Sequence, residues 1–150
     1  MPDPEPTTPQ QPITLTPIGY VEREETEPTG ADAIPDLRAK RVRLVLNPEV
    51  REALLGVEPG SDLMVVTYLH RASQDVLQVH PRGNPDRPLR GVFATRSPSR
   101  PNPIGVTTVR VEAVDDTVLT VVGLDALDGT PILDLKSYAA GFDTPYDGES

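Results

Sequence analysis

The 150-residue sequence predicts one all-β domain, a small barrel or sandwich with a single short helix. Short apolar stretches rich in Val, Leu and Ile recur between turn-forming residues, as in sheets built from many short strands. No amphipathic pattern extends beyond two helical turns. The chain contains only 2 Phe and no Trp, so aliphatic side chains must fill the core.

The expected strands differ in how they would be buried. Residues 62–69 form a nearly continuous apolar run, which predicts a strand buried on both faces. Residues 106–114 and 118–124 flank a short polar turn and form the best hairpin in the chain. The other strand candidates are residues 13–23, 42–46, 76–80 and 132–135.

The hairpin strand alternates between apolar and charged residues. Val109, Val111 and Ala113 are predicted to share the inner face, and Arg110 and Glu112 the outer face.

A short helix is expected between the second and third strands. Asn47 can cap a helix and Pro48 suits its first turn, so we predict a helix over residues 49–55 that ends at Gly56. The limits of the domain follow from composition. We expect a disordered tail over residues 1–12, the folded domain over residues 13–138 and a loosely held tail over residues 139–150.

Composition narrows the chemistry that the chain can perform. With 0 Cys there is no thiol nucleophile and no cysteine-based zinc site, and the 2 His lie in different segments, so we expect no metal site. No Rossmann glycine motif or Walker loop is present. The sequence shows neither a signal-peptide pattern nor an apolar run of transmembrane length, so a cytoplasmic protein without a membrane partner is expected.

Charge is distributed unevenly along the chain. The formal net charge is −9, which argues weakly against nucleic acid as a partner. Residues 71–110, however, hold 7 bases and 2 acids, and every base is an arginine. Arginine suits bidentate contacts with phosphate or carboxylate and stacking on a base. The alternative is a solvated face with counterions.

A stiff cationic loop is expected within residues 91–105. Pro98, Pro101 and Pro103 fix the backbone, so this segment can be neither helix nor central strand. The flanking apolar residues are expected to form strands on both sides. Arg96 and Arg100 would thus be held in place before an anionic ligand arrives.

This loop and the segment 124–136, which contains Asp125 and Asp128-Gly129-Thr130-Pro131, resemble the signature of the TsaA-like (YaeB/TrmO) family. Weaker similarity extends from Ile18-Gly19 to Gly83. Members of that family are S-adenosylmethionine-dependent tRNA methyltransferases that methylate N6 of N6-threonylcarbamoyladenosine next to the anticodon. The resemblance implies a β-barrel that acts as a homodimer, with S-adenosylmethionine as cofactor and tRNA as partner.

The resemblance also implies the site residues. The cofactor contacts carried over are His70, Arg71, Arg96, Val106, Leu124, Asp125, Ala126, Leu127 and Asp128. Our own hypothesis is that Asp125, Asp128 or His70 accepts the N6 proton or orients the amine, because these are the plausible bases near the signature loops. The residues expected to contact tRNA are Arg100, Asn102, Arg82 and Lys136. Alternatives stay open, because Arg100 and Asn102 could brace the loop, Asp128-Gly129 is typical of a tight turn, and His70 could simply end a strand.

The sequence departs from the family pattern at two places. The family's Pro-Arg-Gln motif is missing, and the nearest corresponding residues are Pro28-Thr29-Gly30. Ser137 stands where the family usually has proline. Two alternatives therefore accompany the main hypothesis: a methyltransferase of the same fold that acts on a small-molecule acceptor, and a non-catalytic barrel that binds cofactor or RNA.

Overall fold

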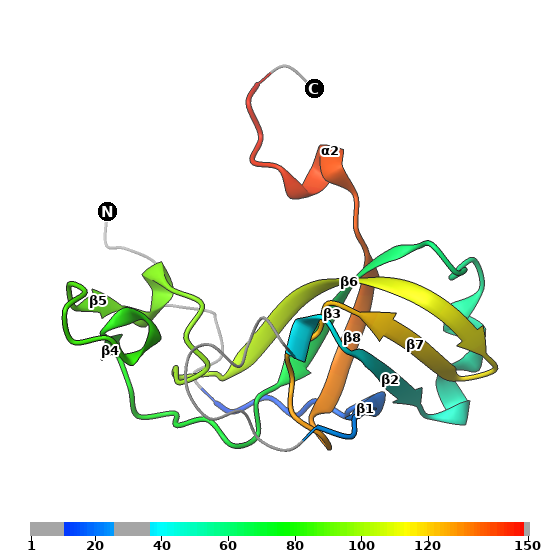
Figure 1. The fold of residues 1–150 in the computed structure, drawn as a ribbon, viewed down its shortest axis with the longest axis horizontal. Coiled ribbons are helices and arrows are strands. Elements are labelled where there is room, and N and C mark those ends of the chain that lie inside the picture. Colours follow the sequence, from blue (N-terminus) through cyan, green and yellow to red (C-terminus); the bar gives the residue numbers. More distant parts are fainter. Residues whose placement is uncertain (1–10, 26–36, 149–150) are drawn as a thin grey trace, which may run out of the picture.

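A computed structural model, which describes residues 11–25 and 37–148, shows a closed six-stranded antiparallel barrel in the order β1-β2-β7-β6-β3-β8 (Figure 1). The predicted all-β barrel is therefore confirmed. Its strands are β1 (Gly19–Glu22), β2 (Arg41–Leu46), β3 (Asp62–Tyr68), β6 (Ile104–Asp115), β7 (Val118–Val122) and β8 (Pro131–Ser137).

The barrel interior is aliphatic, as the composition predicts. Alternate residues of each strand point inward, and Leu44, Val65 and Leu119 are fully buried. Leu124 and Ala126, which follow β7 without belonging to a strand, join the same core. The core therefore holds part of the Asp-Gly segment in place.

The inner face of the hairpin differs from the prediction at one position. Val109 and Val111 are buried as predicted, but Ala113 is exposed and Val114 packs against the core instead. The register between β6 and β7 shifts between Val111 and Ala113, so Glu112 is an extra residue in the ladder. Such a bulge reverses the in–out order of every residue beyond it.

The short helix expected over residues 49–55 is present as the 3-10 helix η1 (Pro48–Leu54), and the Asn47 side chain donates to the Pro17 carbonyl at 3.2 Å instead of capping it. One local prediction was wrong. Val92 and Phe93, expected to be strand-like, begin the 3-10 turn η3 (Val92–Ala94).

A second unit extends from the barrel between β3 and β6. We call residues 76–95 the arm; it contains β4 (Gln78–Val79), η2 (Pro81–Gly83), β5 (Arg90–Gly91) and η3. β4 and β5 pair only with each other, and Figure 1 shows the arm on the left, away from the barrel. The arm returns to β6 through the proline-rich loop.

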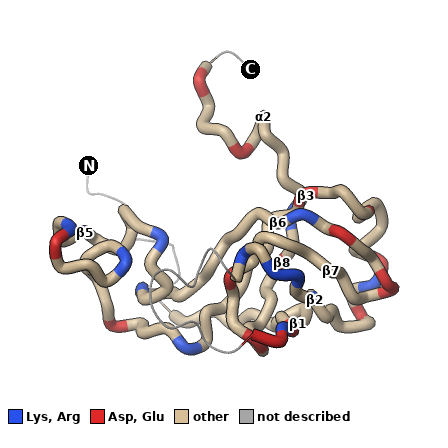
Figure 2. Tube along the Cα trace, viewed as in Figure 1, with Lys and Arg blue, Asp and Glu red and all other residues tan. Residues whose placement is uncertain are grey.

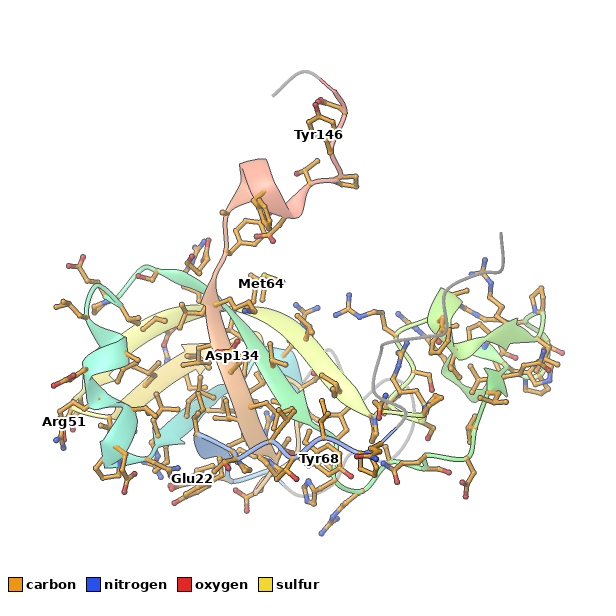
Figure 3. All side chains as sticks on the ribbon, turned by 180° about the vertical axis from the view of Figure 1, so that it is seen from behind. Glu22, Arg51, Met64, Tyr68, Asp134 and Tyr146 are labelled. Carbon is orange, nitrogen blue, oxygen red and sulfur yellow. The ribbon has the colours of Figure 1, made fainter. Side chains whose placement is uncertain are left out.

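The two chain ends are only partly described. Nearly all of the predicted tail 1–12 and all of Pro28-Thr29-Gly30 lie outside the described residues. Beyond β8 the chain leaves the barrel with one helical turn, α2 (Ala140–Asp143), and Phe142 and Tyr146 are exposed. Figure 3 shows Tyr146 at the end of this segment, away from the barrel. Among the described residues, no helix has the length and apolarity needed to cross a bilayer.

The most unusual buried group is the Arg23 guanidinium, because only 1% of this side chain is exposed. Arg23 follows Val21 in the inward alternation and extends it just beyond β1. Its Nε donates to Glu25 at 3.2 Å. Its terminal nitrogens donate to three main-chain carbonyls, those of Leu124 at 3.1 Å, Ala126 at 2.8 Å and Leu37 at 2.9 Å. One cation thus joins three segments that are distant in sequence.

Replacing Arg23 with Met should leave those three carbonyls without their donor. Because buried groups that lose a charged partner are costly, Arg23→Met should lower the free energy of unfolding by about 2–4 kcal/mol, measured by urea denaturation. The matched control is Arg43→Met, since Arg43 pairs with Glu22 on the surface and should contribute only about 0–1 kcal/mol. Equal losses in the two variants would contradict this role of Arg23.

Candidate functional site

A cavity of about 840 Å³ lies where three segments meet. The β3–β6 ribbon, with Met64 and Thr107, supplies one wall, and Figure 3 shows Met64 on β3. The proline-rich loop supplies the second wall, and the segment that follows β7 supplies the third. The volume falls within the range typical of small-molecule and cofactor sites.

Most residues predicted to contact the cofactor line this one cavity. They are His70, Arg71, Arg96, Val106, Leu124, Asp125, Ala126 and Leu127. Arg100, predicted to contact tRNA, lines it as well. Asp128, Asn102, Arg82 and Lys136 are not among the residues that line it. The two corners singled out by the sequence, one with guanidinium groups and one with a carboxylate, therefore face the same space.

Hydrogen bonds within the cationic corner give its two arginines different roles. The Arg96 guanidinium donates to the carbonyl of Val106, and its side chain is exposed at the cavity. Its remaining N–H groups are available to an anion. Arg100 is partly buried and braces the loop from inside. Its guanidinium donates to three carbonyls of the same segment, those of Thr95 at 3.3 Å, Ser97 at 3.1 Å and Val92 at 3.1 Å.

The carboxylate corner is held in place by Arg23. The Arg23 guanidinium donates to the carbonyls on either side of Asp125, those of Leu124 and Ala126, so the Asp125 main chain is fixed from both sides. The half-buried Asp125 side chain makes no hydrogen bond or ion pair within residues 11–25 and 37–148. The exposed His70 ring at the mouth of the cavity also has no such partner there. Both groups are therefore available to a ligand.

Asp128 has a local role that the sequence left open. Its carboxylate accepts the backbone N–H of Arg23 at 2.9 Å. The next residue, Gly129, has a φ of 80° and donates its N–H to the Val21 carbonyl at 2.7 Å. This geometry favours the tight-turn interpretation, in which Asp128-Gly129 docks the cavity segment onto β1.

The remaining tRNA candidates do not line the cavity. Lys136 forms an ion pair with Asp134 at 3.0 Å on β8, where Figure 3 shows Asp134. Arg82 lies on the arm in η2 with a φ of 58°. Asn102 is exposed in the proline-rich loop, where its carbonyl accepts the Ile104 N–H at 2.7 Å.

Sequence reasoning missed Arg23 and Arg38. Arg38 lines the cavity, and its Nε donates to the Gly123 carbonyl at 3.0 Å. The only signal for Arg23 was its inward place two residues after Val21, and no pattern marks Arg38.

The pKa of Glu25, the carboxylate beside Arg23, is lowered. The main cause is a hydrogen bond from the Glu25 backbone, and Arg23 acts in the same direction. Within the described chain, no group of three His, Cys, Asp or Glu side chains could hold a metal ion.

Known proteins resemble this chain over most of its length. A probable S-adenosyl-L-methionine-binding protein of Pyrococcus horikoshii is 35% identical over 135 residues, which cover 87% of this chain and 86% of the relative. The tRNA (adenine(37)-N6)-methyltransferase of Mus musculus is 33% identical over 143 residues, which cover 89% of this chain and 32% of the mouse protein.

Solved structures agree with these relatives. The crystal structure of TrmO from Pseudomonas aeruginosa superposes with a TM-score of 0.70 at 35% identity, covering 91% of this chain and 60% of that one. The chain thus spans less than two thirds of the solved TrmO protein. Residues 8–144 match the family model of the tRNA-methyltransferase O N-terminal domain. The chain therefore belongs to the family of the tRNA-methyltransferase O N-terminal domain, as its two signature loops indicated.

Proposed function

We propose that this protein is an S-adenosylmethionine-dependent methyltransferase that acts on N6 of adenine 37 in tRNA, with N6-threonylcarbamoyladenosine as the modified base. The observation that carries the proposal is the shared cavity, in which Arg96 and Asp125 face one space lined by apolar residues. The names of the relatives from Pyrococcus horikoshii and mouse support the cofactor and the acceptor.

The chemistry of the cavity fits this cofactor. The amino-acid carboxylate of S-adenosylmethionine suits the exposed Arg96 guanidinium. Its flat adenine suits the apolar walls formed by Val106, Leu124 and Leu127. The main chain around Asp125, fixed by Arg23, offers further polar contacts to the ribose or the base.

S-adenosylmethionine supplies an electrophilic methyl group, and its transfer forms an N–C bond, breaks an S–C bond and releases one proton from N6. The protein therefore has to position the amine, exclude water and accept that proton. Asp125 is the carboxylate that lines the cavity without a partner among the described residues, whereas Asp128 is engaged by Arg23. We assign the proton to Asp125, with the His70 ring as the competing base at the mouth.

Two further expectations accompany this proposal. The resemblance predicts a homodimer and the composition predicts a cytoplasmic location, and both stay predictions. The small-molecule acceptor and the non-catalytic barrel remain the competing hypotheses. Transfer of methyl groups to tRNA from a strain that lacks the modification would exclude both, and binding of cofactor without transfer to any tRNA would favour the non-catalytic barrel.

Replacing Asp125 with Asn should remove the proton acceptor and keep the shape of the cavity. We expect kcat to fall about 10²–10⁴-fold, the usual contribution of a general base, and the Kd for S-adenosylmethionine to change little in calorimetry. The matched control is Asp134→Asn on β8, whose carboxylate pairs with Lys136 and should not affect turnover. Normal kcat with a weaker Kd would instead place Asp125 on the ribose and leave His70 as the base.

Replacing Arg96 with Ala should remove the guanidinium that binds the cofactor's carboxylate. Calorimetry should show S-adenosylmethionine bound about ten- to a hundredfold more weakly, in line with one charge-assisted hydrogen-bonding group. 5′-Methylthioadenosine lacks that carboxylate, so it should bind the wild type and Arg96→Ala equally. Arg110→Ala serves as the surface control, because Arg110 pairs with Asp62 outside the cavity. Equal weakening of both ligands would contradict this role of Arg96.

A further inference from the structure

The arm has little core of its own, and it is continuous with the cavity. Its two short strands, β4 and β5, pair only with each other, and Val92 is its one buried apolar residue. Directly after η3 the chain enters the loop from Arg96 to Arg100 that lines the cavity. A ligand that lies along the arm would therefore reach the mouth of the site.

Three arginines of the arm lack partners within the described part of the chain. Arg82, Arg87 and Arg90 are exposed, and none of their side chains forms a hydrogen bond or ion pair with residues 11–25 or 37–148. The arm has a single acid, Asp86, and Figure 2 shows the blue positions grouped around β5. Outside the arm, eight arginine side chains are engaged by carboxylates or carbonyls of the described residues: Arg23, Arg38, Arg41, Arg43, Arg51, Arg96, Arg100 and Arg110.

The backbone that carries these arginines is fixed by local hydrogen bonds. The His80 ring nitrogen Nδ1 lies 2.8 Å from the Arg87 carbonyl oxygen, which closes the loop between β4 and β5. Arg90 pairs with Val79 in the ladder. Guanidinium groups on such a frame suit bidentate contacts with phosphates.

An exposed aromatic residue lies beside this cationic surface. The Phe93 side chain is 82% exposed, although its neighbour Val92 is buried and anchors η3. In the chain Phe93 stands between Arg90 and Arg96, and an exposed aromatic ring among free arginines is typical of proteins that stack unpaired bases while arginines hold the phosphates.

We propose that the arm is the surface that binds the unpaired loop of the RNA substrate. In this arrangement Arg82, Arg87 and Arg90 contact backbone phosphates, Phe93 stacks on a base next to the target, and the target base enters the cavity. The inference rests on the proposed function, because it assumes an RNA acceptor.

A second copy of this chain is the competing occupant, since Leu77 and Leu89 on the arm are also exposed. The unpaired arginines argue for RNA, because a two-fold contact between copies would bring the same uncompensated positive charges together, whereas RNA supplies the opposite charge.

The arginines should be visible in the salt dependence of tRNA binding. Each phosphate contact contributes about 0.7–0.9 to the slope of log K against log salt concentration, so Arg82→Gln/Arg87→Gln/Arg90→Gln should reduce the slope by about 2–3. The matched control is Arg51→Gln. Arg51 pairs with Asp116, and Figure 3 shows Arg51 at the end of the barrel away from the arm, so its slope should equal that of the wild type.

Phe93 should give a different signature. Stacking involves no counterion release, so Phe93→Ala should weaken tRNA binding about tenfold at every salt concentration and leave the slope unchanged. Calorimetry with S-adenosylmethionine should give the wild-type Kd for both variants, which shows that the cavity is intact. If the triple variant fails to fold, the three single substitutions replace it, each expected to reduce the slope by about 0.7–0.9.

The outcomes separate the arm from the function. Suppose that the wild type methylates tRNA and that the arm variants bind tRNA with the wild-type affinity and the wild-type salt dependence. The arm proposal is then overturned and the proposed function stands. If sedimentation shows that Phe93→Ala changes the oligomeric state, the arm is an interface between copies and the proposal is overturned. If the wild type neither binds nor methylates tRNA, both fail.

Discussion

The cavity depends on one buried cation. Arg23 continues the inward alternation just beyond the first strand, and its terminal nitrogens donate to the carbonyls of Leu37, Leu124 and Ala126. A barrel interior of aliphatic side chains offers no acceptors, so the guanidinium is stabilised by these carbonyls together with the Glu25 carboxylate. The same bonds hold the backbone on both sides of Asp125, and they tie the third wall of the site to the barrel.

The opposite wall uses the same chemistry. Arg100 donates to three main-chain carbonyls of the segment that precedes it. Pro98, Pro101 and Pro103 restrict the backbone around Arg100 itself. In both corners an arginine that binds main-chain carbonyls holds a neighbouring side chain, Arg96 or Asp125, in position. A small site that must bind a nucleotide gains affinity when such ordering is complete before the ligand arrives.

The sequence predicts what depends on local pattern. The hairpin strands and the barrel follow from alternation and turn residues, and the two signature loops lie together as their resemblance implied. Ala113 was misplaced because a bulge changes register without changing composition. The burial of Arg23 could not be predicted either, because its acceptors Leu124 and Ala126 are more than 100 residues away in the chain, at separations of 101 and 103.

The treatment of charge differs between the two parts of the molecule. On the barrel, arginines face carboxylates across neighbouring strands, as in Arg110 with Asp62 and Arg43 with Glu22, so its positive charge is neutralised locally. On the arm, three arginines have no such neighbour within the described chain. A protein with a net charge of −9 repels a polyanion at long range, so it can approach RNA only through a surface where positive charge is left unpaired. Whether each arginine is paired with a neighbouring carboxylate, and not the net charge of the chain, therefore decides where RNA can bind.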